Sequence, residues 1–131
     1  MIVLDASAAI ELLLLTPRGL VMRPRVFSPE ESLHAPQLLD IEIAHALRRH
    51  VYRRELTSLR AAQALEDLAD LTAERHGHVL FLPRIWQLRD TMSAYDAAYI
   101  SLAEHLQAPL LTCDEKLART AGHSAKIELI K

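Results

Sequence analysis

The chain lacks several features that define whole classes of protein. It has a single cysteine, Cys113, so it forms no internal disulfide and fits a reducing compartment. Its apolar runs stay short of the roughly 18 residues that a membrane span requires. The early leucine run is interrupted by Asp5 and Glu11 and has no basic segment before it, which argues against a signal peptide. We therefore expect a cytoplasmic protein with no membrane segment.

A strong net charge and a glycine-rich phosphate loop are also missing. The 15 Lys and Arg residues oppose 17 Asp and Glu residues, for a net charge of -2, and only 3 glycines are present. No bulk basic field therefore indicates a nucleic-acid partner, although a nuclease that holds cations in an acidic site is often acidic overall. The basic residues Arg48, Arg49, Arg53 and Arg54 cluster on one predicted helix, either as a solvated face or as a binding surface.

What the chain does have is a hydrophobic content of 50% and a length of 131 residues, which together predict one domain, residues 1–131, with a substantial core. The segment Met1–Ser7 opens with three consecutive apolar residues, the pattern of a strand buried on both faces of a parallel sheet. The strand ends at Asp5, and a helix is expected over residues 8–15 with Ser7 as its N-cap. Open α/β sheets bind ligands at the carboxyl ends of their strands, so Asp5 is the first candidate for chemistry.

Strands and helices alternate along the rest of the chain. Residues 16–31 are expected to form a loop with a short helix at most, because prolines punctuate them. Further strands are predicted at residues 32–36, 78–82, 109–113 and 127–130, and further helices at residues 37–54, 58–71, 85–92, 94–106 and 115–121. This alternation predicts an α/β fold of three layers, a mostly parallel central sheet of about five strands flanked by helices.

Four carboxylates are expected to meet at one edge of this sheet. Asp5 and Asp114 each follow a predicted strand, and Glu42 and Asp96 lie near the apolar sides of two helices. A carboxylate at such a boundary loses hydration, and a divalent cation compensates that loss strongly. Clusters that offer only oxygen ligands suit Mg²⁺ or Mn²⁺.

Three of these acids also have a purely structural interpretation. Asp96 stands in a capping box with Ser93, Asp114 is a suitable N-cap for the next helix, and the side chain of Glu42 is long enough to reach solvent. Asp5 has no such alternative, since the first helix already has its predicted cap.

The sequence gives little support for a metal site with histidine ligands. Zinc prefers histidine or cysteine ligands, and of the seven histidines only His76 and His78 have a ligand-like spacing. No thiol joins this pair, and the second histidine enters a predicted strand. We therefore expect the histidines not to assemble, and Cys113 to belong to the core.

Taken in order, four blocks of the sequence resemble those of a known family. They are Met1–Ser7, then Pro36 followed by Glu42 at the start of a helix, then Tyr95–Tyr99, then Leu111–Asp114. In this order and at these separations they resemble the PIN-domain ribonucleases and, within them, the VapC toxins of bacterial toxin-antitoxin pairs. The resemblance covers nearly the whole chain.

The resemblance implies a metal-dependent endoribonuclease that uses Mg²⁺ or Mn²⁺. It implies that the catalytic, metal-binding acids are Asp5, Glu42, Asp96 and Asp114, with Ser7 and Thr112 hydrogen-bonded around them. It also implies a homodimer and a VapB-type antitoxin whose C-terminal segment lies over the acidic site. The cluster from Arg48 to Arg54 would then contact RNA or the antitoxin.

Water is the expected nucleophile, so cleavage should leave 5′-phosphate and 3′-hydroxyl ends. Two alternatives stay open. The first is a phosphotransfer enzyme in which Asp5 forms an aspartyl-phosphate, although that class wants Asp-x-Asp where this chain has Asp5-Ala-Ser7. The second is a catalytically silent PIN-like module that binds RNA or a protein. The sequence does not specify which RNA is cut.

Overall fold

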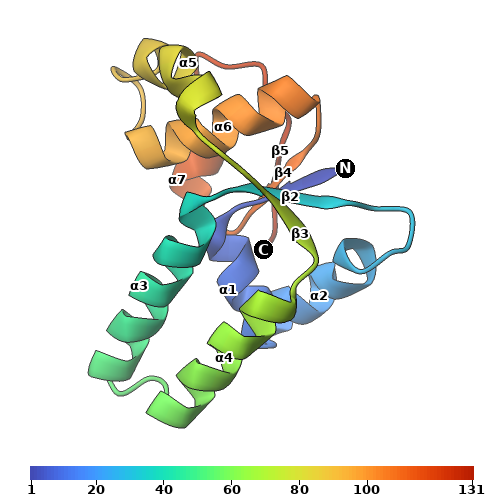
Figure 1. Ribbon diagram of the computed structural model, residues 1–131, viewed down its shortest axis with the longest axis vertical. Helices are drawn as coiled ribbons and strands as arrows, with labels where there is room; N and C mark the ends of the chain where they lie inside the picture. The colour runs from blue at the N-terminus through green and yellow to red at the C-terminus, as the bar shows by residue number, and fades with distance from the viewer.

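Five parallel strands form one sheet in the computed structural model, which describes residues 1–131 (Figure 1). The strand order is β3-β2-β1-β4-β5, with β1 at the centre. The strands are β1 (Ile2–Leu4), β2 (Leu33–Pro36), β3 (Ala73–His76), β4 (Leu110–Thr112) and β5 (Ile127–Leu129). Because every pairing is parallel, all five strands end at the same edge of the sheet.

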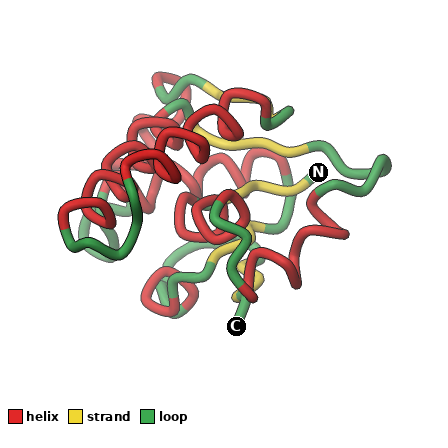
Figure 2. Tube along the Cα trace, turned by 90° about the horizontal axis from the view of Figure 1, so that it is seen from below, coloured by secondary structure: helices red, strands yellow, loops and turns green.

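Helices cover both faces of this sheet, as the three-layer prediction requires. They are α1 (Ala6–Leu13), α2 (Pro17–Val26), α3 (Leu38–Tyr52), α4 (Ser58–Asp70), α5 (Leu82–Gln87), α6 (Ala94–Leu106) and α7 (Glu115–Ala118), with a 3₁₀ turn, η1 (Val79–Phe81). The helices α3 and α4 form an antiparallel pair that projects from the sheet, whereas α5 and α6 lie at the opposite end of the molecule (Figure 1). A view from below shows helices around the strands on more than one side (Figure 2).

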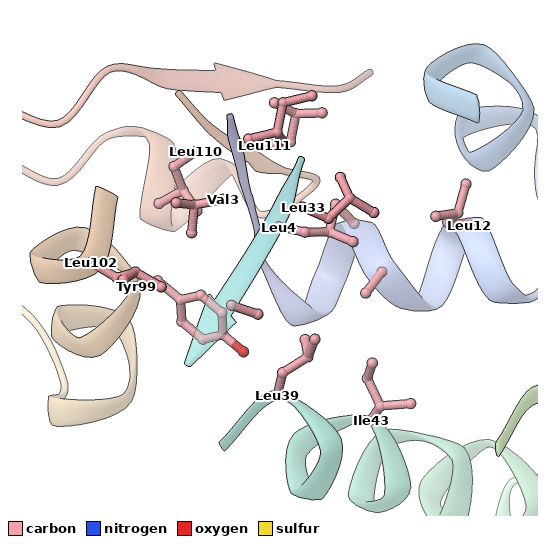
Figure 3. Packing of buried hydrophobic residues seen from close by; sticks show 14 of the residues in the cluster. Val3, Leu4, Leu12, Leu33, Leu39, Ile43, Tyr99, Leu102, Leu110 and Leu111 are labelled. Atoms are coloured by element: carbon pink, nitrogen blue, oxygen red, sulfur yellow. The ribbon is translucent and has the colours of Figure 1, made fainter. Parts of the chain in front are cut away.

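The hydrophobic core has two parts, one on each face of the sheet. Val3 and Leu110 are paired in register and lie beside Leu102 of α6 (Figure 3). On the other face, Leu4 lies toward Leu12 of α1 (Figure 3). All three residues of β1 are fully buried, and each such side chain stabilises the fold by about 1.5–3 kcal/mol. This confirms the prediction of a central strand buried on both faces.

The predicted strand at residues 78–82 is wrong. The strand is Ala73–His76, and the apolar run that follows forms η1 and the start of α5, with Val79 and Leu80 more than 70% exposed. A short apolar run does not distinguish a buried strand from a helical turn. The real strand lies at the edge of the sheet, where polar side chains are tolerated and the hydrophobic pattern is weak. The helix expected at residues 85–92 is correspondingly shifted to Leu82–Gln87.

Residues 17–26 form a full helix where a loop was expected. Pro17 occupies the first turn, where its missing N–H costs nothing, and the Thr16 hydroxyl accepts a hydrogen bond from Gly19 N. Pro24 lies inside the helix. Gly19 permits a close contact with α1, because a Cβ atom there would lie 2.1 Å from the Glu11 carbonyl oxygen.

The predicted cap of the first helix also needs correction. Asp5, rather than Ser7, is the N-cap of α1, and its side chain accepts a hydrogen bond from Ser7 N. The last helix ends at Ala118, earlier than expected. The helix at residues 94–106 is confirmed to the residue. No helix of the structure combines the length and the apolar character that crossing a membrane requires.

Candidate active site

The structure brings Asp5, Glu42, Asp96 and Asp114 to the lining of one open pocket of about 380 Å³. Asp5 follows β1, Asp114 follows β4, and Glu42 and Asp96 lie near the N-terminal ends of α3 and α6. The pocket therefore lies at the carboxyl edge of the parallel sheet, where open α/β folds bind their ligands. The sequence order places these acids far apart, and the topology assembles them.

Asp5 is held by one side chain from the first turn of α1 and one from the end of the neighbouring strand β4. It is 6% exposed, and its Oδ2 accepts hydrogen bonds from Ser7 Oγ at 2.5 Å and from Thr112 Oγ1 at 2.8 Å. Ser7 Oγ in turn accepts a hydrogen bond from Cys113 N at 2.9 Å, and Thr112 Oγ1 accepts one from Asp114 N at 3.0 Å. The ends of β1 and β4 are thus joined by one hydrogen-bond network that leaves little freedom to the Asp5 carboxylate.

Glu42 receives its hydrogen bond from Tyr99, a buried residue of α6. The hydroxyl of Tyr99 donates to Glu42 Oε1 at 2.8 Å. The aromatic ring is fully buried and reaches from α6 toward the first turns of α3, where Leu39 lies (Figure 3). Burial raises the pKa of Tyr99, so the hydroxyl keeps its proton and remains a donor. Tyr99 therefore fixes the position of Glu42 across two helices.

Two of the pocket acids, Asp96 and Asp114, also lie at the starts of helices. The hydroxyl of Ser93 accepts a hydrogen bond from Asp96 N at 3.1 Å and caps α6. Asp114 caps α7, because its Oδ1 accepts hydrogen bonds from Lys116 N at 2.8 Å and from Leu117 N at 3.3 Å. The structural interpretation of Asp114 is therefore correct, and the residue lines the pocket as well.

Burial raises the pKa values of three of the acids, and neighbouring negative charge adds to the effect for two of them, Glu42 and Asp96. Burial is the main cause for Asp5, opposed by the hydrogen bonds from Ser7 and Thr112. Burial also raises the pKa of Glu42, and the charges of Asp5 and Asp96 add to that effect. For Asp96, burial comes first and the charges of Asp5 and Asp114 follow.

Such mutual repulsion is relieved when a cation occupies the pocket. The four acids offer only oxygen ligands, a set that fits Mg²⁺ or Mn²⁺ in preference to zinc.

The wall of the pocket also carries positive and titratable groups. Arg18 comes from α2, and His45, Arg49 and His50 come from α3. The sequence does not point to Arg18, because its segment is predicted as a loop with a short helix at most and not as the helix α2. His45 lies three residues after Glu42 on the same helix, a spacing that places both on one face.

The arginine cluster does not form one surface at this pocket. Arg49 lines it, whereas the guanidinium of Arg48 stacks on the ring of Tyr52 with its carbon 4.6 Å from the ring centroid. Arg53 and Arg54 follow the last turn of α3. Of the four arginines, Arg49 is thus the one placed to contact a molecule bound in the acidic pocket.

The expectation that the histidines do not assemble is wrong. His34 and His76 are in hydrogen-bond contact, and Glu74 lies beside them. None of the three lines the acidic pocket. The partner of His76 is therefore a histidine of the neighbouring strand, and His78 is not part of the group.

Comparisons with known proteins agree with the geometry. The family model described as PIN domain matches residues 2–123. The chain is 42% identical over 130 residues to Ribonuclease VapC12 of Mycobacterium tuberculosis, an alignment that covers 99% of both chains. It is 38% identical over 130 residues to Ribonuclease VapC9 of the same species, which covers 99% of this chain and 98% of the relative.

A solved structure shares the fold. It is the crystal structure of VapBC2 from Rickettsia felis bound to a DNA fragment from their promoter. The TM-score is 0.71 and the similarity covers 100% of both chains, with 14% sequence identity. At that identity the likeness concerns the fold alone.

Proposed function

This chain belongs to the PIN domain family, among its VapC ribonucleases, and from that premise we propose that it is a metal-dependent endoribonuclease, the toxin of a VapBC pair. The observation that carries the proposal is the pocket in which four carboxylates meet, where burial and neighbouring negative charge raise the pKa values of Glu42 and Asp96. Folded proteins seldom gather like charges in this way without a ligand that compensates them.

Asp5, Glu42, Asp96 and Asp114 are the residues that would hold Mg²⁺ or Mn²⁺. When bound, such an ion polarises a phosphate group and lowers the pKa of a water molecule beside it. The chain's own contribution is to hold the ligands in place. Ser7 and Thr112 orient the Asp5 carboxylate, and Asp114 is fixed as a helix cap.

The attacking group is water rather than a side chain. Ser7 Oγ already donates to Asp5 and accepts from Cys113 N, so it has no role left as a nucleophile. Among the acids, the Asp96 carboxylate is best placed to accept the proton of the attacking water. Burial and the charges of Asp5 and Asp114 raise its pKa, whereas Asp5 and Asp114 accept backbone hydrogen bonds from Ser7 N, Lys116 N and Leu117 N. The products are a 5′-phosphate and a 3′-hydroxyl.

Arg18 and Arg49 supply positive charge at the wall of an otherwise acidic pocket. A phosphodiester backbone is attracted by arginine side chains, which bind it without regard to sequence. We assign these two residues to the RNA backbone, at the margin of the cluster of acids. The proposed substrate is RNA.

The phosphotransfer alternative fits the geometry poorly. The Oδ2 atom of Asp5 accepts two hydroxyl hydrogen bonds, and the carboxylate is almost fully buried as a helix cap. That class also wants Asp-x-Asp where this chain has Asp5-Ala-Ser7. The silent binding module remains the second candidate, because intact acids do not by themselves prove turnover.

The partners follow from the same family membership. The relatives that are 38–42% identical are named VapC ribonucleases, which supports a VapB-type antitoxin for this chain. We expect the chain to form a homodimer and to act in the cytoplasm, where its RNA substrate is found.

One experiment tests the function directly. Purified wild type and Asp5→Asn are incubated with total RNA in the presence of Mg²⁺, Mn²⁺ or EDTA, and the new RNA ends are mapped. Cleavage that requires both the metal and Asp5 and leaves 5′-phosphates supports the proposal. Cyclic 2′,3′-phosphate ends would overturn the water mechanism, and metal binding without cleavage would favour the silent module.

A further inference from the structure

We propose that His34, Glu74 and His76 form a second metal site, one that takes a zinc-like divalent ion and is separate from the acidic pocket. His34 lies on β2, and Glu74 and His76 lie on the edge strand β3. In the parallel ladder His34 is aligned with Glu74. Residues two apart on a strand point to the same face, so the sheet itself directs all three side chains to one side. This inference does not rest on the ribonuclease function.

The distances between the ligand atoms suit tetrahedral coordination. His34 Nδ1 is 3.0 Å from His76 Nε2 and 3.5 Å from Glu74 Oε2, and the three atoms lie within 4.8 Å of one another. A zinc ion about 2.0–2.1 Å from each ligand separates tetrahedral neighbours by about 3.3 Å. The two histidine and one carboxylate atoms therefore need little movement to enclose an ion.

The orientation of His34 is fixed by a further hydrogen bond. Its Nε2 lies 2.9 Å from Ser32 Oγ. When Nε2–H donates to that hydroxyl, Nδ1 carries no proton and presents its lone pair to Glu74 and His76. Histidine ligands of metals usually donate their second ring N–H in this way, which fixes both the tautomer and the ring plane.

The site combines a rigid side with an adaptable side. The side chain of His34 is only 7% exposed, whereas that of Glu74 is 66% exposed and free to adjust its rotamer. Both residues line an open cavity of about 420 Å³ that also contains the acidic side chains of Glu31 and Asp70. A cation thus has a route to the ligands, and a water molecule has room at the fourth position.

The ligand types select the class of metal. Two imidazole nitrogens and one carboxylate favour Zn²⁺ and its neighbours Co²⁺ and Ni²⁺, whereas Mg²⁺ prefers oxygen ligands. The ion would join β2 to the edge strand β3, so its binding stabilises the part of the sheet farthest from β4 and β5.

The test is a titration of the purified chain with Co²⁺, followed by visible absorption. Cobalt in a four-coordinate site with imidazole ligands absorbs strongly, whereas cobalt in an oxygen-only six-coordinate site absorbs weakly, so the acidic pocket does not obscure the result. Wild type is compared with His76→Gln and with the matched control His78→Gln, a histidine of the same segment outside the cluster. Circular dichroism confirms that each variant is folded.

We expect strong absorption that saturates at one Co²⁺ per chain in wild type and in His78→Gln, and that disappears when Zn²⁺ is added. His76→Gln should bind at least about tenfold more weakly, and so should Glu74→Gln, whose exposed position makes misfolding an unsuitable explanation. Weak absorption in wild type, or equal titrations of wild type and both cluster variants, would show that His34 and His76 form only a hydrogen-bonded pair.

Discussion

The acidic pocket and the histidine cluster use the same sheet in different ways. The pocket lies at the carboxyl ends of the central strands, and its ligands come from strand ends and helix starts that are distant in sequence. The histidine cluster lies along two adjacent strands at the edge of the sheet. Oxygen donors in the first and nitrogen donors in the second suit different ions. Position within a parallel sheet and donor type together determine which chemistry each cluster supports.

The two regions differ also in how firmly they are held. Asp5 is fixed by hydroxyl groups from α1 and β4, and Glu42 by the hydroxyl of Tyr99. In the histidine cluster only His34 has such a support, and Glu74 is largely exposed. A catalytic site needs its groups in position before the substrate arrives, whereas a stabilising metal site tolerates ligands that move into place.

The largest expected effect separates the two clusters by activity. Asp5→Asn should lower metal-dependent RNA cleavage by more than about 100-fold, because it removes a buried charged ligand while asparagine still caps α1. The matched variant His76→Gln should stay within about twofold of wild type. Initial cleavage rates at saturating Mg²⁺ provide the measurement. A large loss of cleavage rate in His76→Gln would contradict the proposal that the two regions act separately.

The hydroxyl of Tyr99 offers a finer change in the acidic pocket. Tyr99→Phe keeps the buried ring and removes only the hydrogen bond to Glu42, so we expect cleavage to fall by about tenfold. That hydrogen bond lowers the pKa of Glu42, so its loss should also move the acidic limb of the pH–rate profile to higher pH. Tyr95→Phe, at an exposed position of the same helix, is the control and should be unchanged.

Two arginines of α3 test how far the acidic pocket extends. Arg49 lines it, and Arg48 stacks on Tyr52 away from it. Arg49→Ala should weaken RNA binding several-fold and reduce the slope of log affinity against log salt by about 1, since one phosphate contact is lost. Arg48→Ala should leave the slope unchanged. Binding is measured in Ca²⁺ or with Asp5→Asn to prevent cleavage.

The smallest expected effect is a pH dependence of stability without metal. The raised pKa values of Glu42 and Asp96 mean that the folded protein holds protons which the unfolded chain has already released. Stability from these groups is therefore fully present below the unfolded pKa and is lost as the pH rises through the folded pKa. Urea unfolding in EDTA should show this contribution as a difference between wild type and Asp96→Asn that shrinks with rising pH. The same pH dependence in both proteins would contradict it.

Elements with strong local patterns could be predicted from the sequence. The helix at residues 94–106 has a Ser93 cap and a continuous apolar side, and its ends were predicted to the residue. The strand Ala73–His76 is short, polar and paired on one side only, so it has no recognisable periodicity. The helix Pro17–Val26 was hidden by its prolines, one of which lies in the first turn where it is favourable.

For the candidate sites, too, features with a local sequence pattern could be predicted, whereas contacts that depend on tertiary packing could not. The four acids were foreseen because each stands at the end of a strand or the start of a helix. Tyr99 was not foreseen as a partner of Glu42, because the contact spans 57 positions of sequence and depends on how α6 packs against α3. The pairing of His34 with His76 depends on the ladder between β2 and β3, so the misplaced strand concealed it.

The central position of β1 has a consequence for how the protein is made. Asp5 is synthesised first, but its partner Thr112 lies 107 residues later on β4. A ribosome that has completed the chain only as far as α6 has produced three of the four acids. It has not yet produced β4, whose Thr112 donates a hydrogen bond to Asp5. The nascent polypeptide acquires its acidic pocket only when β4 has emerged and paired with β1.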